Sequence, residues 1–326
     1  MTNKPEYTYI SPCMSCSAKN KPVEIVEPNV EMSNRGAVLV LVYNETDYGK
    51  ECIESLDNHL PNDVSVVLID NGSDANLAKH FKKRYPWIHS LRNSENAGYA
   101  GGNNVGAKYA IQRGANKVYY LNDDTVVCPN FWEACERDMR QHSAGIVGSV
   151  ILHYHDPERI QEAGKHWNLN TFRYITRGVD KNYDTIDKNF YDCDSVCGAG
   201  FMASADVIKE TGGFEEDFFF FYEETDLCLR LKSCGVRIGI SGESQILHKG
   251  SQTIGSINPM FSYYAVRNYG WLIRRHSSGV FSFMLGVLQV AKVMGHYLKE
   301  GVTTGKVRSV QATLKGIFDG IVGQVP

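Results

Sequence analysis

Two clusters of acidic residues carry the clearest chemistry in this chain of 326 residues. The first is the adjacent pair Asp123-Asp124, which ends an apolar run. Two neighbouring carboxylates offer the hard oxygen ligands that Mg²⁺ or Mn²⁺ takes when it is shared with substrate phosphates. The sequence Asn-Asp-Asp-Thr is also typical of a turn or a helix cap, so the pattern by itself leaves both interpretations open.

The second cluster is Glu223-Glu224-Thr225-Asp226, which follows four phenylalanines and a tyrosine at residues 218–222. Apolar neighbours raise the pKa of a carboxyl group and create the partly dry setting in which a glutamate works as a general base. A helical pattern follows the cluster, and acidic residues also favour a helix N-terminus because of the helix dipole. A catalytic and a structural interpretation therefore both remain.

His248 is a third candidate, at the end of a short predicted strand over residues 244–247. A single histidine is more often a surface or core residue than a metal ligand. Its interpretation depends on the two acidic clusters.

The elements that position these residues follow from the apolar pattern. Continuous apolar runs rich in β-branched or aromatic residues predict buried strands at 37–43, 64–69 and 117–121. Helical spacing predicts helices at 47–59 and 75–84, and a glycine-rich loop at 96–106 leads into a helix that ends at Gln112. This alternation predicts an α/β domain with a mainly parallel, Rossmann-like sheet.

Polar residues follow three of the predicted strands, at 43–45, 70–73 and 122–125. In open α/β sheets, ligands bind at the carboxyl ends of the strands, so these segments are expected to line one crevice. Beyond Trp132 the pattern is less regular, with a strand at 146–152, a loop-like stretch at 154–194 and an apolar run at 196–202. The acceptor surface is expected in the loop-like stretch.

Composition narrows the class of protein. The hydrophobic fraction of 43% and the net charge of -3 fit a soluble globular chain and give no electrostatic reason to expect a nucleic-acid partner. Nine scattered cysteines favour a reducing cytoplasm over a disulfide framework, and Cys13 and Cys16 lack a second pair for a zinc site. The first 28 residues contain no apolar run like that of a signal peptide, so a cytoplasmic location is predicted.

An ordered series of motifs resembles the family 2 inverting glycosyltransferases, and above all their rhamnosyltransferase-like branch. The resemblance covers residues 36–275 and is more specific as a series than any one motif. It implies a GT-A fold, a nucleoside-diphosphate sugar donor and inversion at the anomeric carbon. The matching segments are 42–44, 69–73, 96–103, 122–125, 198–201, 212–214 and 223–226.

Carried onto this chain, the resemblance implies a Mg²⁺ or Mn²⁺ ion held by Asp124, with Asp123 and His248, and a general base at Glu224. The branch often has aspartate at the position of Glu224, so Glu223 and Glu224 both remain candidates for the base. The resemblance also implies that the loop at 96–104 closes around the donor nucleotide. The expected donor-binding residues are Tyr43, Asn44, Glu45, Asp70, Asn71, Asn96, Gly98, Tyr99, Gly102, Asn103 and Asp123.

The chain is expected to divide into an N-terminal extension at 1–35, a catalytic domain at 36–255 and a C-terminal helical region at 256–326. Apolar residues recur at helical spacing over 307–321 with basic residues nearby, which predicts contact with a membrane surface or with a second subunit in a homodimer. Packing onto the catalytic domain explains the pattern equally well. The apolar run at 280–291 is shorter than the roughly 20 residues that span a bilayer, so no transmembrane anchor is expected.

The resulting hypothesis is a hexosyltransferase of cell-envelope polysaccharide synthesis. Its donor is a dTDP- or UDP-linked sugar, with rhamnose favoured by the resemblance, and its acceptor is a glycan or a lipid-linked saccharide, reached from the inner face of the cytoplasmic membrane. A catalytically silent sugar-nucleotide-binding or assembly protein with the same fold is the main alternative. A nucleotidyltransferase is disfavoured because no basic glycine-rich loop follows the first strand, and a dehydrogenase because Gly-x-Gly-x-x-Gly is missing there.

Overall fold

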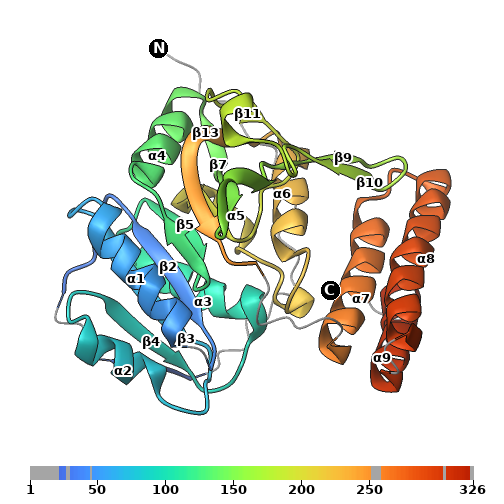
Figure 1. Cartoon of the computed structure of the whole chain (residues 1–326), viewed down its shortest axis with the longest axis horizontal. Helices are drawn as coiled ribbons and strands as arrows, with labels where there is room; N and C mark the ends of the chain where they lie inside the picture. Colours follow the sequence, from blue (N-terminus) through green and yellow to red (C-terminus); the bar gives the residue numbers. More distant parts are fainter. Residues whose placement is uncertain (1–21, 27–29, 45, 251–257, 304–305, 324–326) are drawn as a thin grey trace.

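The computed structural model describes residues 22–26, 30–44, 46–250, 258–303 and 306–323. One large sheet with helices on both faces forms the body, and three C-terminal helices stand together along one side of it (Figure 1). Glu45, the pair Cys13 and Cys16, and the predicted boundary at residue 255 lie outside the described residues.

The main sheet has the strand order β1-β4-β3-β2-β5-β12-β7-β13-β11, with β6 on β13 and β8 on β7. Its strands are β1 (Val23–Val26), β2 (Ala37–Val42), β3 (Ser65–Asp70), β4 (His89–Asn93), β5 (Lys117–Asn122), β6 (Thr125–Val127), β7 (Ala144–His153), β8 (Asp156–Glu162), β11 (Tyr191–Asp192), β12 (Gly200–Ser204) and β13 (Arg237–His248). A separate hairpin consists of β9 (Lys165–Asn168) and β10 (Arg173–Thr176).

The helices alternate with these strands and then continue alone at the C-terminal end. They are α1 (Asp47–His59), α2 (Leu77–Arg84), α3 (Gly98–Gln112), α4 (Phe131–Gln141), α5 (Ala205–Thr211), α6 (Glu223–Ser233), α7 (Pro259–His276), α8 (Val280–Thr303) and α9 (Val307–Ile321), with short 3-10 turns η1 (Tyr183–Thr185) and η2 (Glu216–Phe218).

The two faces of the sheet carry separate cores. Strands β4, β3, β2 and β5 are parallel, as the sequence predicts, and their side chains alternate between the faces. Leu39 and Ile69 pack under α3, α5 and α6, whereas Val40 and Leu68 pack under α1, α2 and α4. Strands buried on both faces explain the continuous apolar runs in the sequence. Past β5 the sheet is mixed, because β12 runs antiparallel to both of its neighbours.

The glycine-rich segment is helical, so the predicted loop at 96–106 is wrong. Helix α3 begins at Gly98 and lies directly on the sheet. A Cβ atom on Gly102 would stand 2.5 Å from Leu41 Cδ1, and one on Gly106 would stand 2.7 Å from Ile69 Cδ1. The glycines are therefore needed for close packing between helix and sheet, and this need outweighs their low intrinsic helix propensity.

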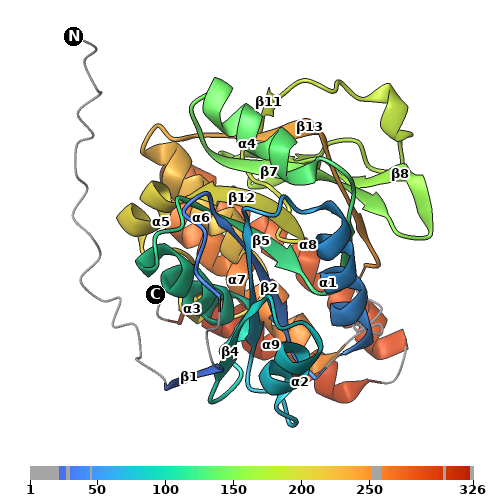
Figure 2. The ribbon, with the colours of Figure 1, turned by 90° about the vertical axis from the view of Figure 1, so that its left-hand side faces the viewer.

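Two further expectations differ from the structure. The stretch at 154–194 is not one loop but contains β8, the β9–β10 hairpin, η1 and β11, whose strands are largely exposed and so lack a clear apolar period. The N-terminal extension contributes β1, which pairs antiparallel with β4 along one edge of the sheet (Figure 2).

Helices α7, α8 and α9 form a bundle against the catalytic body. Small residues allow α7 and α9 to approach closely, since a Cβ atom on Gly320 would stand 2.7 Å from the backbone oxygen of Arg267. Helix α8 has 24 residues, and its segment Val280–Lys299 is long and apolar enough to cross a membrane by length and composition. The expectation that this run is too short to span a bilayer is therefore wrong.

We expect Gly320→Ala to destabilise the protein by about 1–3 kcal/mol, because the added methyl group meets the backbone of α7, which cannot move aside like a side chain. Gly295→Ala is the matched control, because no atom lies within 4 Å of the added Cβ in the same bundle. The free energy of unfolding of that variant should rise by up to about 1 kcal/mol, because alanine has a higher helix propensity than glycine. Denaturant unfolding measures both, and equal stability of the two variants would contradict the close α7–α9 contact.

Candidate active site

The predicted site residues gather at one edge of the sheet. Strands β2, β3 and β5 end there, and β12, which runs the other way, begins there at Gly200, paired with Leu121. Strand β13 reaches the same edge because β6, which directly follows the acidic pair, pairs with its last residues, Thr125 opposite His248. Residues remote in sequence therefore meet because of strand register.

Asp124 and His248 form the core of a candidate metal site. His248 Nε2 lies 3.2 Å from Asp124 Oδ1, and both side chains are mostly buried. Asp124 Oδ1 makes no hydrogen bond among the described residues. The ring Nδ1 of His248 lies 2.9 Å from Gln161 Oε1. Since an amide oxygen only accepts, Nδ1 carries a proton, and Nε2 is the ring nitrogen that faces Asp124 and is placed to bind a metal.

This arrangement fits a divalent ion. Two ligand atoms of one octahedral ion stand about 3 Å apart when each lies about 2.1 Å from the metal, close to the separation of these two atoms. The described residues contain no cluster of three His, Cys, Asp or Glu side chains that could hold a metal, and the predicted part of Asp123 in the site stays a prediction. Asp123 lies near Cys52 of α1, where burial and then the Asp123 charge raise the pKa of the thiol.

Glu223 and Glu224 occupy the first turn of α6, where their charges favour the helix dipole. Glu223 is buried and Glu224 is half-buried, and burial raises the pKa of each carboxyl group. Oε2 of Glu223 has no hydrogen-bond partner among the described residues, and the neighbouring Glu224 charge raises the pKa of Glu223 further. Glu224 lies beside Gly198, two residues before β12, which places it at the edge that holds Asp124.

A buried ion pair, missed in the sequence, favours the charged form of Glu224. Lys165 Nζ donates to Glu162 Oε1 at 2.6 Å. Burial lowers the pKa of Lys165, but the carboxylate of Glu162 and, more weakly, that of Glu224 raise it above its ordinary value. In turn, the Lys165 charge and the Thr225 hydroxyl oppose the effect of burial on Glu224. Glu224, rather than Glu223, is thus the better candidate for an ionised base.

Two of the expected donor-binding residues organise the end of β3. Asp70 is fully buried, and its oxygens accept from the backbone amides of Ser73 and Leu77 and pair with Arg92. Asn71 joins the same region to the start of α3, because its amide donates to Asn96 Oδ1 and to Gly98 O at 3.0 Å each. Their predicted contacts with a nucleotide stay predictions.

Tyr43 and Asn44 lie in the open at the end of β2. Tyr43 is exposed, and Asn44 adopts the left-handed region, with its backbone amide donating to Ser73 Oγ. Asn44 Oδ1 also accepts from the backbone amide of Asp74 at 2.8 Å. These contacts hold the ends of β2 and β3 side by side and leave the Tyr43 ring available to a ligand.

The remaining expected donor residues belong to α3. Gly102 and Asn103 are buried against the sheet, and Asn103 Nδ2 donates to Tyr99 O. The Tyr99 hydroxyl donates to Gly198 O at 2.6 Å, beside Glu224. Gly98 packs closely against the aromatic turn before α6, since a Cβ atom added to it would stand 2.3 Å from Phe219 O. Helix α3 thus supports the acidic cluster, and its contact with a nucleotide stays a prediction.

The comparison with known families decides the class of protein. The family described as glycosyl transferase family 2 matches residues 37–212, more than half of the chain. The chain belongs to glycosyl transferase family 2. The matched segment includes the acidic pair and the start of β12, and it ends before α6.

A curated relative agrees with this assignment. This glycosyltransferase is 24% identical over 272 residues to the dTDP-rhamnosyl transferase RfbF of Shigella flexneri, covering 79% of this chain and 86% of the relative. The alignment covers far more of the chain than the family match does, so part of the likeness lies outside residues 37–212.

Two solved structures share the fold of this glycosyltransferase. The mannosyltransferase PcManGT of Pyrobaculum calidifontis, in complex with GDP-Man and Mn²⁺, has a TM-score of 0.56 and 12% identity, covering 94% of this chain and 92% of its own. The structure of GalNAc-T7 with UDP, GalNAc and Mn²⁺ has a TM-score of 0.55 and 16% identity, covering 68% of this chain and 44% of its own. The GT-A fold predicted from the sequence is therefore confirmed.

In this glycosyltransferase, helix α7 clamps the aromatic turn that precedes α6. Phe219, Phe221 and Tyr222 all have positive φ angles, a strained conformation for such side chains. Nδ2 of the fully buried Asn268 lies 2.8 Å from each of three backbone oxygens, those of Phe218, Phe220 and Phe221. The clamp fixes the turn that aims Glu223 and Glu224.

A second contact joins α7 to α6. The fully buried Asp226 accepts from His276 at 3.0 Å and pairs with Arg230 and Arg275. Burial alone would raise the pKa of Asp226, but the His276 hydrogen bond and the charges of Arg230 and Arg275 hold it at about 2. The glycosyltransferase thus keeps this acid ionised and structural, two residues after Glu224.

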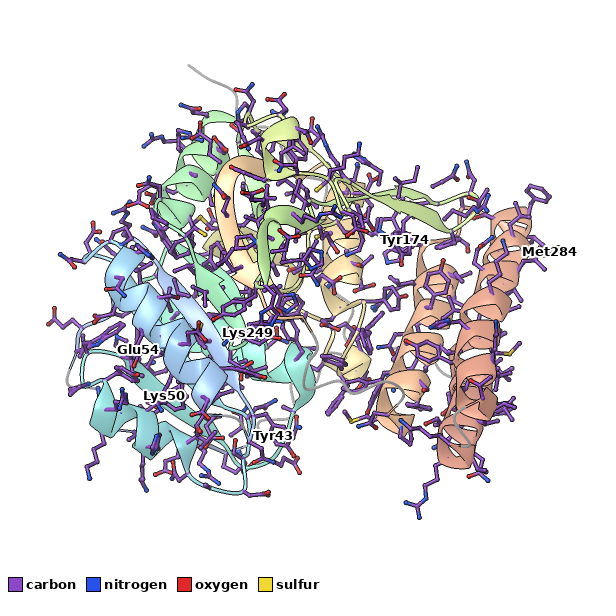
Figure 3. The ribbon with its side chains drawn as sticks, in the orientation of Figure 1. Tyr43, Lys50, Glu54, Tyr174, Lys249 and Met284 are labelled. Atoms are coloured by element: carbon purple, nitrogen blue, oxygen red, sulfur yellow. The ribbon has the colours of Figure 1, made fainter. Side chains whose placement is uncertain are left out.

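Lys249 is a further residue that the sequence reasoning missed. Its backbone amide donates to Asp124 O at 3.0 Å, and its ammonium group pairs with Glu51 and lies 4.3 Å from the centre of the Tyr48 ring. Figure 3 shows Lys249 near the middle of the molecule. Its place directly after His248 was the available signal, and its backbone ties the end of β13 to Asp124.

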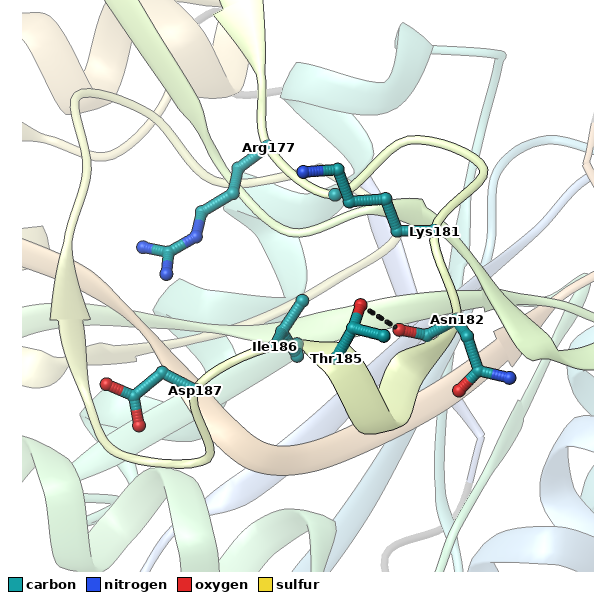
Figure 4. A pocket seen from close by; sticks show the side chains of 7 residues that line it. Arg177, Lys181, Asn182, Thr185, Ile186 and Asp187 are labelled. Atoms are coloured by element: carbon teal, nitrogen blue, oxygen red, sulfur yellow. Dashed lines mark hydrogen bonds between the residues drawn. The ribbon is translucent and has the colours of Figure 1, made fainter.

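Two cavities of the molecule do not include the acidic pair or Glu224. A pocket of about 480 Å³ is lined by residues 177–187 and presents Arg177 and Lys181 (Figure 4). A cavity of about 950 Å³ lies between β1, α3 and η2, and of the expected donor residues only Asn96 lines it. Neither includes Glu224, Asp124 or His248.

We expect Asn268→Ala to lower kcat about 100-fold while donor affinity stays near that of the wild type, because the candidate base on α6 is misplaced but the β2, β3 and β5 ends are untouched. Met260→Ala, at an exposed position of the same helix, is the control. Kinetics and donor titration check this. An Asn268→Ala enzyme with normal kcat would show that the turn holds its shape without the clamp.

Proposed function

We propose that the chain transfers rhamnose from a dTDP- or UDP-linked donor to a hydroxyl group of a saccharide or lipid-linked acceptor, with inversion at the anomeric carbon. The observation that carries the proposal is the convergence of the half-buried Glu224 carboxylate and the Asp124–His248 pair on one edge of a GT-A sheet. The choice of sugar rests on the relative from Shigella flexneri, whose name specifies dTDP-rhamnosyl transfer.

We propose that Asp124 and His248 hold a divalent ion. A carboxylate and an imidazole together suit Mn²⁺ better than Mg²⁺, which prefers oxygen ligands alone. Both solved neighbours are complexes with Mn²⁺, which supports the same choice. When bound, the ion supplies positive charge for the departing diphosphate.

In the proposed reaction Glu224 accepts the proton of the acceptor hydroxyl while the hydroxyl oxygen attacks the anomeric carbon. The bond from that carbon to the donor phosphate breaks on the opposite face, and the diphosphate leaves with the electron pair. No protein nucleophile takes part in a single displacement. The thiol of Cys197 fits this scheme, because burial raises its pKa and favours the unreactive thiol form.

This function suits an enzyme of cell-envelope polysaccharide synthesis that works in the cytoplasm at the inner face of the membrane. The nine cysteines, of which the seven described are free, accord with a reducing compartment.

Asp124→Ala should abolish the Mn²⁺-dependent part of donor-nucleotide affinity, because it removes a buried ligand oxygen. Gln161→Leu should weaken Mn²⁺ affinity only about 10- to 100-fold, because it removes the group that orients His248. Asp57→Ala, on the exposed face of α1, is the control. Isothermal titration with dTDP and UDP, with and without Mn²⁺, measures these effects. Full Mn²⁺-dependent affinity in Asp124→Ala would rule out this metal site.

Glu224→Gln should retain donor binding and lose transfer by about 10² to 10⁴, because an amide of similar shape cannot take the acceptor proton. Glu223→Gln is the matched comparison and should affect transfer far less, because burial and the Glu224 charge both raise the pKa of Glu223, whereas the Lys165 charge opposes the effect of burial on Glu224. The assay follows product formation and donor hydrolysis separately. A dead Glu223→Gln beside an active Glu224→Gln would assign the base to Glu223.

The pH profile offers an independent check. Burial raises the pKa of Glu224 above its ordinary value, and the base works ionised, so kcat should fall as pH drops through this raised pKa. The Lys165 charge opposes that rise more strongly than Glu162 supports it. Replacing both as Lys165→Met with Glu162→Gln should therefore move the acidic limb to higher pH. An acidic limb that does not move would show that this ion pair has no effect on the pKa of the base.

A further inference from the structure

Helix α9 leaves several of its large apolar residues on the outside, although Ile317 and Ile321 are half-buried against the core of the bundle. Ser309, Thr313, Gly316 and Gly320 are its buried residues, packed toward α7. On the opposite stripe Leu314, Phe318 and Val322 are 52%, 63% and 65% exposed. A surface helix of a soluble globular protein turns its apolar stripe toward the core. Small residues at the helix contact with large apolar residues outside are instead the packing pattern of helices that face lipid.

Helix α8 continues this surface. Phe281, Met284 and Leu288 recur on one exposed stripe, and Met284 lies at the outer edge of the molecule, beyond the sheet and α7 (Figure 3). Nine of the fifteen large apolar side chains that are exposed among the described residues lie between 280 and 322. Such a concentration marks a docking surface rather than scattered exposure.

Charge identifies what covers this surface. The exposed polar residues of α8 and α9 are mainly basic, namely Lys292, Lys299, Lys306, Arg308 and Lys315. Asp319, an acidic residue in the same region, is turned toward α7, where it accepts from the Tyr263 hydroxyl at 2.7 Å. A second copy of the same face would bring like charges together, whereas an anionic lipid surface attracts both the basic and the apolar groups.

We propose that the outward faces of α8 and α9, defined by Phe281, Met284, Leu288, Leu314, Phe318 and Val322, lie on an anionic membrane surface. The helices lie along the surface rather than across it, because α8 stays attached to the catalytic body through Ser282, whose hydroxyl donates to Leu169 O beside the β9–β10 hairpin. The contact deepens the proposed function, since α7 links this surface to the turn before Glu224 and a lipid-linked acceptor lies in the same plane.

Flotation of the full chain with vesicles tests the contact without any donor or acceptor, so its outcome is independent of the proposed reaction. The protein should float with vesicles of phosphatidylglycerol and phosphatidylcholine in equal parts, and weakly with phosphatidylcholine alone. Leu314→Gln with Phe318→Gln should remove flotation. Changing Lys292, Lys299 and Lys315 to Gln should weaken binding about 100-fold. Val179→Gln, an exposed apolar position away from the bundle, is the control.

Each outcome decides the matter. Loss of flotation in the two bundle variants, with normal melting temperatures and normal flotation of Val179→Gln, supports the lipid surface. A wild-type chain that ignores anionic vesicles overturns it. If that chain is a dimer that Leu314→Gln with Phe318→Gln dissociates in light scattering, the face is a subunit interface. Resistance to extraction at high pH would also overturn the proposal, because α8 would then cross the bilayer.

Discussion

The first turn of α6 is the constraint on which the rest of the site depends. It places Glu223 in a buried and Glu224 in a half-buried position, among backbone carbonyls and a carboxylate that are costly to bury unless they are hydrogen-bonded or paired. Asn268 donates hydrogen bonds to the backbone carbonyls of the strained aromatic turn that precedes them. Arg275 and His276 pair with the carboxylate of Asp226, which follows them. All three partners lie on α7. The catalytic domain is thus completed by a helix beyond its family boundary at residue 212.

The candidate metal site depends on register rather than on a local motif. The pairing of β6 with β13 sets His248 opposite Thr125, and this brings its ring to Asp124. Gln161, which contacts the His248 ring, lies on β8, and β8 pairs with β7. The orientation of His248 therefore depends on three strands, β6, β8 and β13. Because each residue reaches the site through a different strand, a shift in any one register would dismantle it.

Helix α7 also relates the chemistry to the outer surface. One of its sides grips the turn before Glu224, and its other side receives the small residues of α9. The contact is close because Gly270, Gly316 and Gly320 leave no Cβ atoms between the helices. A rigid connection of this kind fixes the distance of Glu224, the proposed general base, from any surface on which α8 and α9 lie.

The sequence by itself determined the parallel half of the sheet, because strands buried on both faces read as continuous apolar runs, and it determined the family through motifs at strand ends. It also named Asp124, His248 and Glu224, which the structure gathers at one edge. Only the tertiary structure decided that residues 98–112 form a helix, since the room for Gly102 and Gly106 depends on Leu41 and Ile69 from other strands. It alone supplied Gln161, Lys165 and Asn268, whose contacts join residues far apart in the chain and leave no local pattern.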